Sequence, residues 1–274
     1  MKVLIGVATY PTPPAVYPAA QAAIDALDRG GHERVMVEYY GDDDPKLSHP
    51  DNLTIKHNRM RSAVLDLGYD ALLTIEADMI VPSDALVKLA AVDADVAMGL
   101  YVSRNSHIWL CIPTIDGYKG NALNANRDAA RAAWGKVIKS EGAGFGCTMI
   151  RRNVLEKIEF RNHPKRKFAD DWQFALDCKE HGFKMAHDLS VVCGHIIHEG
   201  GVLWPDIDAP ELHRVEGVGV PQHKGIVLPD VATYRVLRPI SGPRKEYKVG
   251  DSIELRAEDA AIFFERRAIE NMEN

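Results

Sequence analysis

The sequence predicts an α/β fold in which helices cover both faces of a mainly parallel β-sheet, giving three layers, followed by a small C-terminal module. Over the first hundred residues, apolar β-branched runs alternate with segments of helical spacing. These runs are continuously apolar, which is typical of strands buried on both faces. The chain has 274 residues and is 46% hydrophobic, enough to bury a core of this kind.

The individual elements follow from hydrophobic spacing and from the glycines and prolines that interrupt it. In the first half we expect strands at 3–10, 35–40, 71–75 and 96–102, and helices at 15–28, 58–67 and 85–91. In the second half we expect a loop with a short alanine-rich helix at 104–135, a strand turning into a helix at 148–158, a helix at 171–181 and a strand at 190–197.

The character of the sequence changes near residue 225, where short polar turns separate strand-like runs and a charged segment leads to the end. We therefore predict a main domain at 1–224 and a small module, a β-hairpin with a helix, at 225–274. No internal repeat or low-complexity tract is evident.

Composition excludes several classes of function. The formal net charge is −6, from 33 Lys and Arg against 39 Asp and Glu, so no global attraction to nucleic acid or anionic membrane is expected. The four cysteines form no C-x-x-C pair, which argues against a disulfide framework or a structural zinc site and favours a reducing cytoplasm. No run approaches the ~18 uncharged apolar residues of a membrane span, and the N-terminal apolar run VLIGVA is too short for a secretory signal.

The stretch LLTIEADMIVPSD contains two carboxylates one residue apart, Glu76 and Asp78, where a predicted strand ends. Ligands of open α/β sheets bind at the carboxyl ends of the strands. Two interpretations are open on this motif alone. The pair holds a divalent metal with a phosphorylated ligand, Mg²⁺ or Mn²⁺ being suited to oxygen ligands, or it forms a solvated turn before the next helix.

Several motifs in register resemble the nucleotide-sugar half of GT-A fold glycosyltransferases, in particular those of the family 2 type. They are HNRMRSAVLDLGYDALLTIEADMIVP (57–82), ADVAMGLYVSR (94–104), GAGFGCTMIRRNVLEKI (142–158), FADDWQFALDCKEHGFKMAHD (168–188) and GHI (194–196). The resemblance covers roughly residues 3–200 in the order of the family.

The resemblance implies a role for each matching residue. Thr9, Tyr10, Pro11 and Asn58 would surround the nucleotide base, Glu76 with Ala77 would lie near the ribose, Asp78 and His195 would bind the metal, and Asp171 would remove the proton of the acceptor hydroxyl. A position at a helix N-terminus favours the ionised form of Asp171, which predicts an unprotonated base at neutral pH. The chain departs from the family pattern at His57, where many relatives have arginine, at Glu76, where aspartate is common, and at Asp170, where glutamate is usual, so the base could be Asp170.

Each assignment has a structural alternative. Asp170 and Asp171 could only cap a helix, and His195 could be a hydrogen-bonded core histidine. For Arg104, contact with the donor diphosphate and a solvated strand end are both open. The GAGFG stretch resembles a dinucleotide fingerprint, but a strand follows it, so we favour tight backbone lining a sugar or acceptor pocket.

The resemblance implies metal-dependent, inverting transfer of a sugar from a nucleotide-diphosphate sugar, with a UDP-sugar favoured and Mn²⁺ or Mg²⁺ as cofactor. The tail is similar to small accessory domains of bacteriophage proteins, which suggests a hydroxymethylated DNA base or a virion protein as acceptor. Basic residues at 151–152 and 163–167 suit phosphate contacts, or form a solvated charged loop. A nucleotidyltransferase, a non-catalytic sugar-nucleotide or glycan-binding module and a structural virion component are the alternatives.

Overall fold

The computed structural model describes most of the first 217 residues and short stretches beyond them. The described residues are 1–9, 16–41, 43–104, 107–110, 112–113, 122–142, 144–163, 170–197, 201–217, 231–236, 240–241, 246–256 and 269–271. The chain divides into two compact units, Met1–Val218 and Gly219–Asn274, and each is described by itself.

An eight-stranded mixed sheet forms the centre of the first unit, with strand order β2-β1-β3-β8-β5-β9-β7-β6. Its strands are β1 (Lys2–Ala8), β2 (Arg34–Tyr40), β3 (Ala71–Glu76), β5 (Val96–Leu100), β6 (Ile112–Pro113), β7 (Val137–Gly142), β8 (Cys147–Arg151) and β9 (Met185–Val192). β1 pairs in parallel with β2 and β3, and β5 with β9, whereas β8 runs antiparallel between β3 and β5. Consequently β1, β2, β3, β5 and β9 all point the same way, and the parallel arrangement predicted for the first four of these strands is confirmed.

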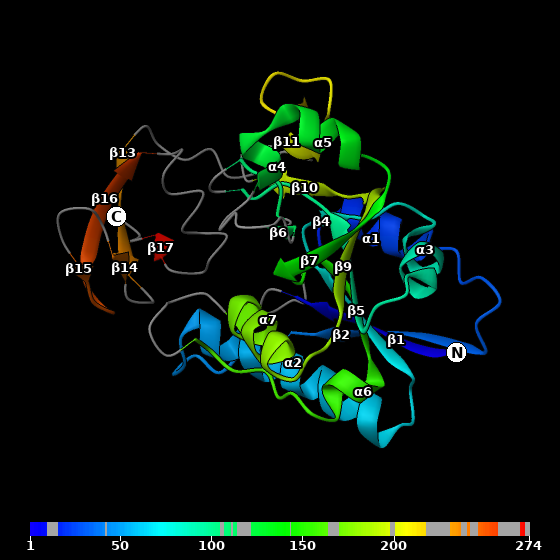
Figure 1. Cartoon of the computed structure of the whole chain (residues 1–274). Helices are drawn as coiled ribbons and strands as arrows, with labels where there is room; N and C mark the ends of the chain where they lie inside the picture. Colours follow the sequence, from blue (N-terminus) through cyan, green and yellow to red (C-terminus); the bar gives the residue numbers. More distant parts are fainter. Residues whose placement is uncertain are drawn as a thin grey trace. The chain divides into compact units, whose positions relative to one another are not determined.

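Helices cover both faces of this sheet, so the first unit has three layers (Figure 1). On one face lie α1 (Pro18–Asp25) and α3 (Ala85–Ala91), and on the other α2 (His49–Asp66), α6 (Arg152–Leu155) and α7 (Asp170–Glu180). Alternate residues of one strand reach the two cores: Leu73 packs with the α1 and α3 side, and Leu72 with Met60 of α2. This alternation is why the strands must be apolar throughout. Among the described residues, two further helices are α4 (Ala122–Ala125) and α5 (Arg127–Ala133).

A second, four-stranded sheet lies against the first and carries part of the site. Its order is β12-β11-β10-β4, and its strands are β4 (Met79–Ile80), β10 (Gly194–Ile197), β11 (Gly201–Pro205) and β12 (His213–Gly217). The chain passes from the large sheet to the small one at Cys193, whose N–H still bonds Leu100 of β5. The single strand predicted at 190–197 is therefore two strands in different sheets.

The second unit contains a three-stranded antiparallel sheet and a two-stranded one. Their strands are β13 (Val231–Val236), β14 (Ile240–Ser241), β15 (Glu246–Tyr247), β16 (Ser252–Arg256) and β17 (Ile269–Asn271). The helix expected near the C-terminus falls largely outside the described residues. In the part of the chain that the structure describes, no helix is both long and apolar enough to cross a membrane.

Candidate metal centre and neighbouring carboxylates

Glu76, Asp78 and His195, here called the metal-candidate cluster, come together where β3 ends. Glu76 is the last residue of β3 and Asp78 lies in the turn to β4. β10 pairs antiparallel with β4, which sets His195 opposite Met79, and the N–H of Ile196 donates to the Asp78 carbonyl at 2.9 Å. Backbone pairing thus fixes the histidine beside the carboxylates, although more than a hundred residues separate them.

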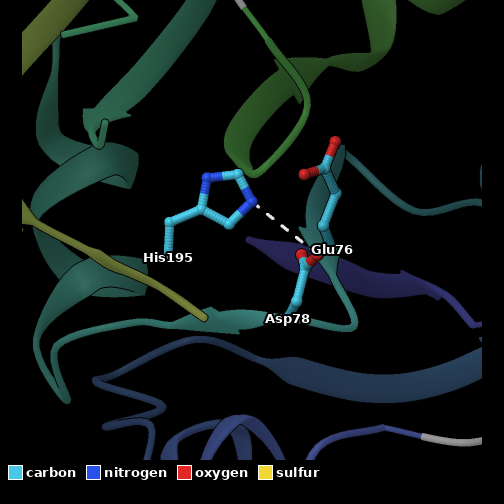
Figure 2. A group of neighbouring side chains, drawn as sticks. All are labelled: Glu76, Asp78 and His195. Atoms are coloured by element: carbon cyan, nitrogen blue, oxygen red, sulfur yellow. Dashed lines mark ion pairs between the residues drawn. The ribbon is translucent and has the colours of Figure 1, made fainter. Parts of the chain in front are cut away.

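The cluster has the donor set and spacing of a cation site. One ligand atom from each of the three residues lies within 4.8 Å of the others (Figure 2). His195 Nδ1 is 2.8 Å from the Val102 carbonyl oxygen, which can only accept, so Nδ1 carries the proton. The ring therefore turns Nε2 toward Asp78 Oδ2, 3.7 Å away. That distance is too long for a hydrogen bond and shorter than two metal–ligand bonds of about 2.1 Å.

His195 Nε2 is buried and has no hydrogen-bond partner among the described residues. A buried polar atom without a partner is costly, and an imidazole whose other nitrogen is held by a carbonyl is a common metal ligand. Two carboxylates and one imidazole suit Mn²⁺ or Mg²⁺. The residues present therefore fit the divalent metal that the sequence motifs imply.

The ionisation of the cluster reflects its burial and its mutual charges. Burial and the neighbouring Asp78 raise the pKa of Glu76. Burial alone would raise the pKa of Asp78 too, but the His195 ring and the Arg104 guanidinium outweigh it and lower that pKa. Burial would lower the pKa of His195, whereas Asp78 and Glu76 raise it on balance. The cluster thus places two carboxylates close together in a buried site, and this arrangement favours the binding of a cation.

In this structure the side chain of Arg104 places a positive charge beside Asp78. Its Nη1 lies 2.6 Å from Asp78 Oδ2, and its side chain is 29% exposed against 3% for that of Asp78. The predicted residue is therefore at the site, where it pairs with the carboxylate rather than standing as a solvated strand end.

The GAGFG stretch makes room for a buried tyrosine. A Cβ at Gly144 would collide with the Tyr101 hydroxyl, and one at Gly146 would lie 2.8 Å from its ring. The Gly146 N–H donates to the hydroxyl oxygen at 3.2 Å, and the ring meets His195 edge-on with centroids 5.8 Å apart. The glycines therefore allow Tyr101 to support the cluster, a role that sequence reasoning missed. The Gly-x-Gly spacing near a strand end was the available signal.

Asp171 lies in the first turn of α7, with its carboxyl group partly buried. Its Oδ1 accepts the N–H of Trp172 at 2.6 Å, and its Oδ2 faces Gly144, 3.6 Å from where a Cβ would be. Burial, followed by the charge of Asp170, raises the pKa of Asp171 to about 7, and Glu76 adds to the rise. The expectation of a fully ionised base at neutral pH is wrong, because desolvation and the neighbouring carboxylate outweigh the helix terminus.

Asp170 is the neighbouring carboxylate that helps to raise the pKa of Asp171, and it contacts the His57 ring. His57 Nδ1 lies 2.8 Å from Asp170 Oδ2, and Asp170 Oδ1 accepts the Asp171 N–H at 3.0 Å. The His57 ring packs against Phe145 and Phe160. Burial would raise the pKa of Asp170, but His57 lowers it. His57 and Asp170, two of the three positions that depart from the family pattern, thus contact each other.

Replacing Asp170 with asparagine should lower the pKa of Asp171 from its value of about 7. Asparagine keeps the shape of the side chain but removes the negative charge that raises this pKa. The other groups acting on Asp171 would remain: Glu76, His57 and the Trp172 N–H. A carboxyl-detected NMR titration measures the change. Glu180→Gln, at the exposed far end of the same helix, is the matched control and should leave this pKa unchanged. An unchanged pKa in Asp170→Asn would remove Asp170 as the cause.

Of the residues expected around the nucleotide base, two are described. Thr9 follows Ala8, which pairs with Glu76, so it lies at the same edge of the sheet as the cluster. Asn58 instead bonds both the N–H and the carbonyl of Phe160, at 2.9 and 2.8 Å, which holds the segment after α6 onto α2. Tyr10 and Pro11 lie outside the described residues. Ala77 is buried, and its carbonyl accepts the Tyr17 N–H.

Sequence reasoning also missed a buried ion pair beside Thr9. Lys56 is 1% exposed, and its Nζ donates to the Thr9 carbonyl at 2.6 Å and pairs with Asp43 at 2.5 Å. A lysine four residues before Met60 lies on the buried face of α2, which was the signal in the sequence. This pair ties the ends of β1 and β2 together next to the cluster.

Gly194 lets β10 approach β11 beside His195. A Cβ there would lie 2.6 Å from both Trp204 and Val202. Gly194→Ala should therefore destabilise the protein by about 1–3 kcal/mol, as overpacking does, and lower its melting temperature by roughly 2–4 °C per kcal/mol. Thermal unfolding measures this. Gly217→Ala, where nothing lies within 4 Å, is the control, and an equal effect of both variants would contradict the packing argument.

Comparison with known proteins finds similarity in fold. No protein-family model and no curated protein matches the sequence. Among solved structures, A197 from STIV matches with a TM-score of 0.51 and 17% identity, over 82% of this chain and 99% of that one. The likeness is one of fold.

Two glycosyltransferase structures are similar at lower scores. One is GalNAc-T7 with UDP, GalNAc and Mn²⁺, with a TM-score of 0.46 and 10% identity, over 72% of this chain and 44% of that one. The other is S. aureus TarS in complex with UDP-GlcNAc, with a TM-score of 0.39 and 13% identity, over 68% and 56%. In fold, the chain is thus similar to A197 and, more weakly, to these GT-A glycosyltransferases.

Proposed function

We propose that this protein is a metal-dependent, inverting glycosyltransferase that moves a sugar from a nucleotide-diphosphate sugar, with a UDP-sugar favoured, to an acceptor hydroxyl. The observation that carries the proposal is the buried His195 Nε2, which faces Asp78 across 3.7 Å at the carboxyl end of β3. The family motifs in register from 57 to 196 support it.

In this proposal Glu76, Asp78 and His195 hold Mn²⁺ or Mg²⁺, which when bound supplies positive charge to neutralise the departing diphosphate. Thr9 and, beyond the described residues, Tyr10 and Pro11 contact the base. Ala77 presents backbone near the ribose, beside Glu76. Arg104 adds a cation beside the diphosphate, where a planar guanidinium matches phosphate oxygens.

Asp171 is the proposed base. The acceptor oxygen forms a bond to the sugar C1 while the bond from C1 to the phosphate oxygen breaks, and its electron pair leaves with the nucleoside diphosphate. The acceptor proton passes to the Asp171 carboxylate. A base with a pKa near 7 combines a useful fraction of the ionised form with enough basicity to accept that proton.

The acceptors proposed are a hydroxymethylated DNA base and a virion protein. Both present the hydroxyl that the reaction needs, and an intact-mass screen of nucleosides and virion proteins after co-expression separates them.

The test is hydrolysis of a panel of UDP-, GDP- and dTDP-sugars with Mn²⁺, with Mg²⁺ and with a chelator. We expect turnover of one donor class that requires the metal. If no nucleotide sugar binds or turns over with either metal, the proposal fails. Release of pyrophosphate from a nucleoside triphosphate and a sugar phosphate would instead identify a nucleotidyltransferase.

A further inference from the structure

Arg104 and the metal-candidate cluster share one oxygen atom. Asp78 Oδ2 is the atom that Arg104 Nη1 approaches to 2.6 Å, and it is also the atom that His195 Nε2 faces at 3.7 Å. A cation held by Asp78 and His195 must use this side of the carboxylate. The arginine and a divalent cation therefore compete for the same ligand.

The charges around the cluster explain why the arginine is there. The side chains of Asp78 and His195 are 3% and 6% exposed, and Glu76 adds a second carboxylate. A buried carboxylate without a positive partner is strongly unfavourable, and the Arg104 guanidinium provides that partner. Once a divalent cation binds, the guanidinium faces a like charge a few ångströms away, and the contact becomes repulsive.

The backbone around Arg104 is anchored, whereas its side chain has access to solvent. Val102 bridges to Trp109, and the Ser103 N–H bonds the Ile108 carbonyl at 2.8 Å. The side chain is 29% exposed, so its long stem can carry the guanidinium away from Asp78 without moving the backbone of this turn.

We propose that Arg104 is a displaceable counter-ion of the metal-candidate cluster, which a divalent cation releases from Asp78 so that its guanidinium can bind an anionic diphosphate. The inference rests on the proposed function, because the diphosphate is that of the nucleotide donor. It makes the binding of metal and of nucleotide cooperative: the first cation frees the group that the diphosphate needs, and by linkage the nucleotide strengthens metal binding.

The experiment measures binding of Mn²⁺ alone, and then of UDP at saturating Mn²⁺, by calorimetry in the wild type and in Arg104→Gln. Without its competitor, Mn²⁺ should bind several-fold more tightly to the variant. UDP should bind about tenfold or more weakly, since a charge-assisted contact to the diphosphate is lost. Arg104→Lys keeps a charge without the planar fork and should fall between the two in both measurements.

A thermal-unfolding measurement accompanies the titrations. In chelator, Arg104→Gln should melt below the wild type, because Asp78 has lost its counter-ion, and Mn²⁺ should restore more stability to the variant than to the wild type. Arg214→Gln is the matched control, since Arg214 is exposed and its ion pairs are with Asp206 and Glu216 rather than with a residue of the cluster. It should change neither affinity.

The outcomes separate this inference from the proposed function. Opposite changes in the two affinities support the counter-ion role. If the wild type binds Mn²⁺ and UDP but Arg104→Gln binds Mn²⁺ no more tightly, or UDP no more weakly, the inference is overturned and the proposed function stands. If the wild type binds no divalent cation, the metal centre fails and both proposals fail with it.

Discussion

Asp78→Asn is expected to lower the affinity for Mn²⁺ by more than about 100-fold, since loss of mere outer-shell partners of metal sites already costs about 10–100-fold. The substitution keeps the shape of the side chain and removes the charge that faces both His195 and Arg104. Metal-dependent binding of UDP should disappear with it. Calorimetry with Mn²⁺, followed by UDP, measures both effects.

Asp93→Asn is the control for removing one negative charge, because the Asp93 side chain is fully exposed and its ion pair is with Lys184. Circular dichroism should verify that Asp78→Asn is folded, since it leaves Arg104 without its carboxylate partner at Asp78. His195→Gln tests the same metal site through its histidine, and it should also lower the affinity for Mn²⁺. Unchanged Mn²⁺ affinity in a folded Asp78→Asn protein would take Asp78 out of the metal site.

The parts of the fold predicted from the sequence are those whose signal is local. β1, β3 and β5 are buried on both faces, so their residues are continuously apolar, and the helices between them show the spacing of one buried face. β7 was missed because four of its six residues are exposed or partly exposed, so it carries little hydrophobic pattern. β4 was also missed, because a strand of only two residues shows no hydrophobic pattern.

Pairing between distant strands is not a local property. The position of β8, antiparallel between β3 and β5, depends on contacts across 72–80 residues to β3 and 50–54 residues to β5, and nothing in its own sequence specifies them. The same holds for the passage of the chain from β9 to β10 at Cys193. That passage brings His195 to the turn after β3, so the gathering of the cluster is a consequence of topology.

At the site, the sequence predicts a divalent metal held by Asp78 and His195, and the structure adds the neighbours of these side chains. The carboxylate pair Glu76 and Asp78 stands out by residue type at a strand end, whereas His195 comes only from the family resemblance, which places Glu76 at the ribose. The contacts of Arg104 with Asp78 and of His57 with Asp170 join segments 26 and 113 residues apart, so no spacing rule predicts them. The ionisation of Asp171 was mispredicted for a related reason. The helix N-terminus is visible in the sequence, whereas the burial of Asp171 and its contact with the charged Asp170 are not.

Asp171→Asn is expected to reduce transfer by about 10²–10⁴-fold, the usual contribution of a positioned base, while UDP affinity at saturating Mn²⁺ stays at the wild-type value. The wild-type rate should rise with pH and level off above about 7, because below that pKa the carboxyl group is protonated and cannot accept the acceptor proton. Asparagine has no such ionisation, so the variant should lose this rise. Rates of donor hydrolysis between pH 5 and pH 9, in the wild type and in the variant, measure both effects.

Glu180→Gln, on the exposed end of α7, controls for loss of one charge from the same helix and should keep both the rate and the pH profile. Asp170→Asn distinguishes the two neighbouring carboxylates. If Asp171 is the base, Asp170→Asn remains active and its rise in rate moves to lower pH, because the pKa of Asp171 falls once the adjacent anion is gone. Near-normal turnover in Asp171→Asn, together with loss of transfer in Asp170→Asn, would instead assign the base to Asp170. In that case His57, which bonds Asp170 at 2.8 Å, would be the group that positions it.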